Sequence, residues 1–146
     1  MQNLFHRIHE WATRKPVGRF DDPVLGELVL NESSWQCSVD TRVGLIIMSV
    51  GGHNQPDERI LDTARETVRH IDKFINRVAD YLAWESKKEV WRPFADEINS
   101  LVIADVNYWW PRDPGAGMIF FKGPDECKLW HCDIDGSRFC GLTFDS

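Results

Sequence analysis

Apolar residues recur every three or four positions between Pro56 and Glu85, and this is the strongest pattern in the chain. Such spacing places the apolar side chains on one face of an α-helix. Acidic residues lie near the start of the segment and basic residues toward its end, which is the order that the helix dipole favours. The pattern therefore predicts one long amphipathic helix over residues 56–85. Its apolar positions are Ile60, Ala64, Val68, Ile71, Ile75, Val78 and Leu82.

Two shorter segments also have helical spacing. Leu4, Phe5, Ile8 and Trp11 share one face of a predicted N-terminal helix over residues 3–13. A second short helix is expected over residues 93–99.

Strand patterns fill residues 24–50 and 101–144, on either side of the long helix. The segment from Arg42 to Val50 is almost entirely apolar, as in a strand that is buried on both faces. Asp135-Gly136 is a strong signal for a hairpin turn. The expected strands cover 24–31, 35–39, 42–50, 101–109, 118–122, 127–134 and 138–144.

No repeat, low-complexity tract or linker divides the 146 residues, so residues 1–146 are expected to form a single domain. The predicted fold class is α+β. We expect a largely antiparallel sheet of about six or seven strands, with the one long amphipathic helix and the short helices packed against it.

Charge and composition exclude several classes of partner. The formal net charge of −6 has the wrong sign for binding nucleic acid, and no apolar run is long enough to span a membrane. The first residues lack the apolar core of a signal peptide, so we expect a cytoplasmic protein whose four Cys are thiols. The seven Trp and eight Phe supply buried area, a binding surface, or both.

A loop rich in aromatic and turn residues follows the strand that ends near Trp109. Trp and Arg dominate binding hot spots, so Trp110 and Arg112, together with Trp109, are the candidate binding residues. The alternative is that strand alternation buries one of the two Trp side chains and that Pro111 and the glycines only make the connection.

The last hairpin suggests a candidate for chemistry. A two-residue turn at Asp135-Gly136 would place His131 opposite Cys140, so Cys140 becomes a candidate nucleophile, with His131 as base and Asp133 as the group that orients it. A shift of one residue in the turn would remove this contact. In the alternative interpretation Cys140 is a small apolar residue, and Asp133 and Arg138 form an ordinary cross-strand pair.

Metal and cofactor sites are not expected. Cys127, His131, Cys132 and Cys140 have ligand chemistry suited to zinc, but they lack paired Cys-x-x-Cys knuckles. Gly51-Gly52 before the long helix has the form of an anion-binding turn, yet Asp57 and Glu58 would repel an anion there.

The stretch Asp22-Pro23-Val24-Leu25-Gly26-Glu27-Leu28, followed by Trp35, a long amphipathic helix and C-terminal strands, resembles the bacterial domain-of-unknown-function family numbered 2262. The resemblance covers most of the chain after residue 19 as an order of elements. It implies a small bacterial cytoplasmic domain and assigns no catalytic residue.

The absence of a strong catalytic motif, together with the acidic charge and abundant aromatic residues, favours a non-enzymatic protein-interaction domain. Neutralisation of a toxin is one concrete form of this function, because acidic charge steers a protein to a basic partner. The alternative is a small-molecule binding domain or a cysteine-dependent enzyme centred on the C-terminal hairpin.

Overall fold

The computed structural model describes residues 18–146, which contain a single eight-stranded sheet with the strands in chain order. The predicted helix over residues 3–13 lies outside the described residues. The strands are β1 (Arg19–Asp22), β2 (Gly26–Asn31), β3 (Ser34–Thr41), β4 (Gly44–Gly51), β5 (Val102–Tyr108), β6 (Ala116–Lys122), β7 (Leu129–Asp135) and β8 (Arg138–Asp145).

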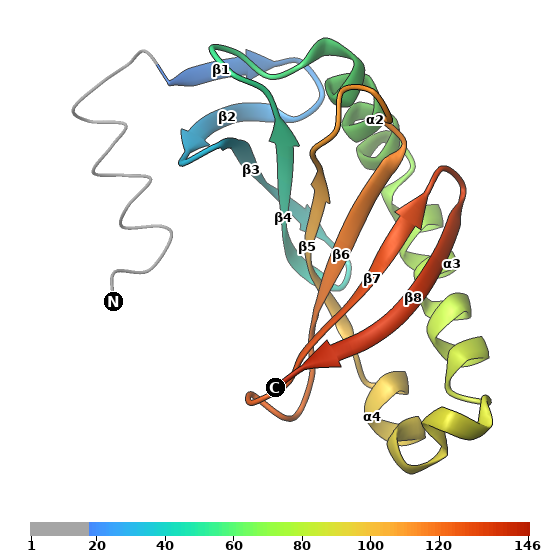
Figure 1. Cartoon of the computed structure of the whole chain (residues 1–146). Helices are drawn as coiled ribbons and strands as arrows, with labels where there is room; N and C mark the ends of the chain where they lie inside the picture. The colour runs from blue at the N-terminus through green and yellow to red at the C-terminus, as the bar shows by residue number, and fades with distance from the viewer. Residues whose placement is uncertain (1–17) are drawn as a thin grey trace.

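Neighbouring strands are antiparallel except for β4 and β5, which are parallel. A parallel pair needs a crossover connection, and all the described helices lie in it. They are α2 (Glu58–Arg69), α3 (Ile71–Glu85), the 3₁₀ helix η1 (Glu89–Phe94) and α4 (Ala95–Asn99). Helix α2 packs on β4 and β5 and α3 reaches β8, so these two helices lie along one face of the sheet, while α4 lies near one end of it (Figure 1).

The predicted fold class is wrong in three respects. The sheet has eight strands and is mixed, because the crossover places β5 parallel to β4. Strand is the predominant structure of the described chain, and the helices are short. Within residues 18–146, no single long amphipathic helix packs on a sheet of six or seven strands.

The predicted helix over 56–85 is divided at His70, where φ is −118° and ψ is 40°. The hydroxyl groups of Thr63 and Thr67 each donate a hydrogen bond to the carbonyl four residues earlier, of Arg59 and Thr63 respectively. Such bonds compete with the helix backbone and bend it. At His70 the helix axis changes direction, but the same apolar side continues to face the sheet. The apolar periodicity therefore runs through His70 without interruption and could not reveal the break.

The core lies between the helices and one face of the sheet. Trp35, Ile46, Met48, Val106 and Ile119 alternate with residues on the opposite face and are at most 2% exposed. The apolar positions Ile60, Leu61 and Ala64 of α2 and Phe74, Ile75, Val78 and Leu82 of α3 cover them.

Many of the aromatic residues pack at the end of the sheet near α4. Trp130 is fully buried against Trp91, Phe94 and Phe144, with ring centroids 4.7 to 6.2 Å apart. Its indole nitrogen donates to the Glu97 carboxylate at 2.6 Å, so the polar atom of this large side chain is satisfied. Much of the aromatic content is therefore core.

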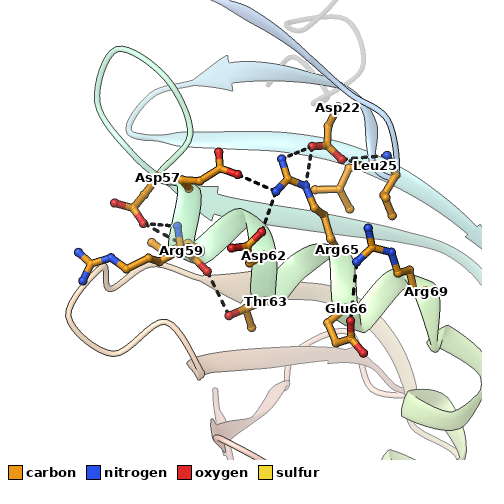
Figure 2. A network of polar contacts seen from close by, with 12 residues as sticks. Asp22, Leu25, Asp57, Arg59, Asp62, Thr63, Arg65, Glu66 and Arg69 are labelled. Carbon is orange, nitrogen blue, oxygen red and sulfur yellow. Dashed lines mark hydrogen bonds and ion pairs between the residues drawn. The ribbon is translucent and has the colours of Figure 1, made fainter.

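The motif that carries the family resemblance forms a turn anchored to α2 (Figure 2). One carboxylate oxygen of Asp22 accepts from the backbone N–H groups of Val24 and Leu25, at 3.0 and 2.9 Å. Its other oxygen accepts from Arg65 Nε at 2.8 Å. Gly26 has a φ of 77°, which glycine adopts without steric cost. Turn geometry and one ion pair therefore explain why this motif has these residue types.

No helix within residues 18–146 combines the length and the apolar character that crossing a membrane requires.

Candidate functional site

Three loops enclose a cleft of about 1250 Å³ at the end of the sheet where β4 and β5 terminate. They are the β2–β3 turn with Glu32 and Ser33, the β4–α2 loop from Gly51 to Glu58, and the β5–β6 loop with Trp109 and Pro111. Because β4 and β5 are parallel, their carboxyl ends meet at the same edge of the sheet (Figure 1). This is the edge at which ligands bind in open sheets that contain parallel strands.

Gly51 and Gly52 are required by close packing. A Cβ atom on Gly51 would lie 2.5 Å from the carbonyl oxygen of Trp109, and one on Gly52 would lie 2.3 Å from that of Gln55. Both distances are too short for a real side chain. Gly51 therefore allows the β4–α2 loop to contact the β5–β6 loop, and this contact forms one wall of the cleft, while Gly52 allows the tight turn within the β4–α2 loop itself.

The helix end beside the cleft is already capped. The Asp57 carboxylate accepts hydrogen bonds from the N–H groups of Arg59 and Ile60, at 3.0 and 3.2 Å. This side chain satisfies the donors that an anion would otherwise use. Glu32 and Glu58 add two more carboxyl groups to the lining, and Glu58 binds Arg65 at 2.8 Å. The cleft is therefore acidic and suits a cationic group better than an anion.

Trp109 and Trp110 differ in exposure. Trp109 is half-buried and lines the cleft, while Trp110 is 48% exposed, and their rings meet edge to face at 5.5 Å. Two successive turn hydrogen bonds, from Asp113 N–H to Trp110 and from Ala116 N–H to Asp113, hold the loop that carries them. Alternation thus buries one Trp in part and leaves the other on the surface, in a loop of defined conformation.

Arg112 lies exposed in the same loop. Its guanidinium has no hydrogen-bond or ion-pair partner among residues 18–146, so no described residue uses its donors. The structure therefore brings all three predicted binding residues into one loop at the edge of the cleft.

The C-terminal hairpin has a different register from the predicted one. Asp135 remains in the strand and pairs with Arg138, so the two turn residues are Gly136 and Ser137. Gly136 has a φ of 62°, which supplies the backbone conformation that the first position of a tight hairpin turn requires. Both Asp-Gly and Gly-Ser fit two-residue turns, so the sequence did not decide between registers that differ by one residue.

This register separates the proposed nucleophile from its base. Cys140 lies opposite Asp133, and His131 lies opposite Thr143, with an irregularity in the ladder between His131 and Asp133. His131 Nε2 lies 3.1 Å from a carboxylate oxygen of Asp145 rather than bonding to Asp133. The predicted pairing of Cys140 with His131 is therefore wrong, and the arrangement lacks the contact that would activate the thiol.

All four Cys are free thiols. Cys37 and Cys132 are buried, and burial raises the pKa of each thiol to about 12. These two side chains act as small apolar core residues, while Cys127 and Cys140 are exposed. Within the described part of the chain, no three His, Cys, Asp or Glu side chains come close enough together to hold a metal ion.

Sequence reasoning missed two exposed features. Trp84 is 60% exposed on α3. It follows the buried Leu82 by two residues, which places it on the opposite side of the helix, and this spacing could have predicted its exposure. Glu32 has a positive φ of 59°, which is uncommon for a residue other than glycine and adds local strain beside the cleft. No sequence pattern distinguished this turn position.

Comparisons with protein-family models, with characterised proteins and with solved structures find no match for this chain. The resemblance to family 2262 therefore stays a prediction.

Proposed function

We propose that this chain is a non-enzymatic binding module that holds a segment of a partner protein at the edge of the acidic cleft. The observation that carries the proposal is Trp110, which is 48% exposed on a loop held by turn hydrogen bonds. An exposed aromatic side chain that is already fixed in position loses little conformational freedom on binding.

The residues around Trp110 define the chemistry of the partner. Arg112 offers unused donors, and the adjacent cleft is lined by the carboxyl groups of Glu32, Asp57 and Glu58. The segment that fits best places an apolar or aromatic side chain against Trp110 and a Lys or Arg in the cleft. The net charge of −6 supports fast encounter with a basic partner. Neutralisation of a basic toxin is one form of this function.

The test compares capture of partner proteins by the wild type and by two single-Trp variants. The tagged full chain is incubated with lysate of the source organism, and retained proteins are identified by mass spectrometry. We expect a near-stoichiometric partner that the wild type retains and that Trp110→Ala loses. A hot-spot Trp contributes at least about 2 kcal/mol, which corresponds to roughly thirtyfold in affinity.

Trp84→Ala is the matched control, because Trp84 is also an exposed Trp but lies on α3. It should retain the partner as the wild type does. Retention by Trp110→Ala, or equal loss in both variants, would contradict the proposal. The melting temperature of Trp110→Ala should fall by only a few degrees, since about half of this side chain is exposed and its ring packs on Trp109.

A further inference from the structure

A second cavity of about 700 Å³ lies between the helices and the sheet. Thr67, Lys73, Phe74 and Arg77 line it from α2 and α3, and the facing side comes from the end of β5, the β5–β6 loop and the β7–β8 hairpin. Its volume is within the range typical of sites for small molecules, about 300 to 1000 Å³. His70, at the break between α2 and α3, also lines the cavity, so both helices run along one side of the cavity.

The floor of the cavity is apolar. Phe74 and Ile134 are 7% and 4% exposed, and Phe139 meets Phe74 edge to face at 5.7 Å. These side chains come from α3, β7 and β8, so they are fixed by the core on both sides. Such a surface suits the flat or aliphatic body of a small molecule.

Two of the hydroxyl groups that line the cavity cannot donate to a ligand. The Thr67 hydroxyl donates its one hydrogen to the Thr63 carbonyl at 3.0 Å. The Tyr108 hydroxyl, 2.8 Å from Thr67 Oγ1, must therefore be the donor in that bond. Both hydroxyl hydrogens are thus already bound, which leaves the exposed Ser137 hydroxyl and the cationic groups as side-chain donors for a ligand anion.

Around the cavity, the acidic side chains have partners of opposite charge or hydrogen-bond partners, whereas two basic side chains have no carboxylate partner in the described part of the chain. The carboxyl group of Asp62 contacts Arg65 at 2.8 Å, and that of Glu66 lies 3.8 Å from Arg69 and 3.1 Å from the His70 ring. Lys73, by contrast, is exposed and has no hydrogen-bond or ion-pair partner among residues 18–146.

Arg77 is the second cation without a carboxylate. Its guanidinium donates to the Ser137 carbonyl and lies 5.0 Å above the Phe139 ring, so donors remain. Lys73 and Arg77 are four residues apart on α3 and therefore share one face of the helix. Two cations without carboxylate partners thus lie beside an apolar floor in a chain whose net charge is negative.

We infer that this cavity binds a small organic anion, whose carboxylate or similar group contacts Lys73 and Arg77 and whose apolar body rests on Phe74, Ile134 and Phe139. This site goes beyond the proposed protein-binding function and does not depend on it.

Three probes with the same phenyl body and different charge test the inference. They are 3-phenylpropionate, 3-phenylpropionamide and 3-phenylpropylamine, each titrated into the full chain while amide NMR shifts are recorded. We expect the carboxylate to bind with a Kd of about 1 mM, as its few atoms allow. The amide should bind about fivefold more weakly and the amine more weakly still. Shifts should centre on Gly136, Ser137 and Lys73.

Lys73→Ala should weaken binding of the carboxylate about fivefold, and Lys73→Arg should restore it. Lys87→Ala removes an exposed Lys just beyond the end of α3 and is the control for overall charge. Equal binding of carboxylate and amide, equal weakening by both Lys→Ala variants, or no saturable binding would overturn the inference. Since Lys73 is exposed, loss of folding does not complicate these variants, and the Trp110 capture experiment is unaffected by the result.

Discussion

Removing a carboxylate from water is unfavourable unless other groups replace its lost hydration, and Asp22 shows how this chain does so. Its side chain is fully buried, and burial alone would raise its pKa. Hydrogen bonds from Arg65 and from the backbone of Leu25 and Val24 outweigh this effect, so the pKa lies below its ordinary value. Asp22 is thus held as a charged group that joins the β1–β2 turn to α2.

Asp22→Asn should destabilise the protein by about 2 kcal/mol at pH 7, because Arg65 loses its buried partner and keeps only the exposed Glu58 and Asp62. The folded-state pKa lies below the unfolded value of about 3.9, so the charge of Asp22 stabilises the fold above that pH. This contribution is lost as pH falls through the folded-state pKa. Urea denaturation followed by Trp fluorescence should therefore show a large difference between variant and wild type at pH 7 and a smaller one at pH 3.

Glu27→Gln is the control in the same hairpin, since Glu27 pairs with Arg19 where both side chains are about 40% exposed. It should change the free energy of unfolding by less than about 1 kcal/mol. A difference for Asp22→Asn that stays constant from pH 7 to pH 3 would show that packing, and not charge, accounts for the loss.

The sequence predicted the turn at Asp22-Pro23 but not the residue that Asp22 binds. An Asp before Pro signals a turn by local chemistry, whereas Arg65 is 43 residues further along the chain. Local patterns likewise placed Trp110 in a turn-rich loop. They did not show that Gly51 packs on the backbone of Trp109 to form the cleft, because that contact depends on the strand order.

The apolar periodicity predicted which segments form helices and strands. It did not predict where each element ends or which other element it packs against. The seven segments with strand patterns coincide with β2 to β8. β1 was not predicted, because Asp21-Asp22-Pro23 has the composition of a turn. Residues Arg19–Asp22 nevertheless form a strand at the edge of the described sheet. The break at His70 and the shift in the last hairpin were missed because both depend on hydrogen bonds that leave the apolar pattern unchanged.

The hydroxyl pair of Thr67 and Tyr108 joins the end of α2 to β5, and a double-mutant cycle should measure this link. Thr67→Val leaves the buried Tyr108 hydroxyl without its acceptor and should cost about 1 to 3 kcal/mol. Tyr108→Phe should cost about 1 kcal/mol. The double variant should be less destabilised than the sum of the two, because no hydroxyl is then left unpaired.

Thr63→Val is the control for the cycle, since the Thr63 hydroxyl bonds only to the backbone of its own helix. It should change stability by about 0.5 kcal/mol or less. Additive effects of Thr67→Val and Tyr108→Phe would mean that the two hydroxyl groups do not stabilise the contact between α2 and β5.

At the scale of the whole molecule, the arrangement of the sheet predicts an order of stability among its strands. β4 and β5 lie in the middle of the sheet, and each pairs with a strand on both sides. The core residues Met48 and Val106 of these strands are fully buried under α2 and α3. β1 has four residues and, among the strands of the described chain, pairs with β2 alone. One parallel junction thus brings segments more than 50 residues apart into the most protected part of the fold.

Native-state amide hydrogen exchange should follow this order. Amides of β4 and β5 should exchange only through global unfolding, so the free energy of their opening should fall with added urea as that of the whole protein does. Amides of β1 should exchange through local fraying, which exposes little surface and hardly responds to urea. The amides of Val24 and Leu25 are the internal reference, because their bonds to the Asp22 carboxylate should protect them although both residues lie in the β1–β2 turn. If β1 and β4 gave the same free energies and the same urea dependence, the sheet would open as one unit and the parallel junction would not be its most stable part.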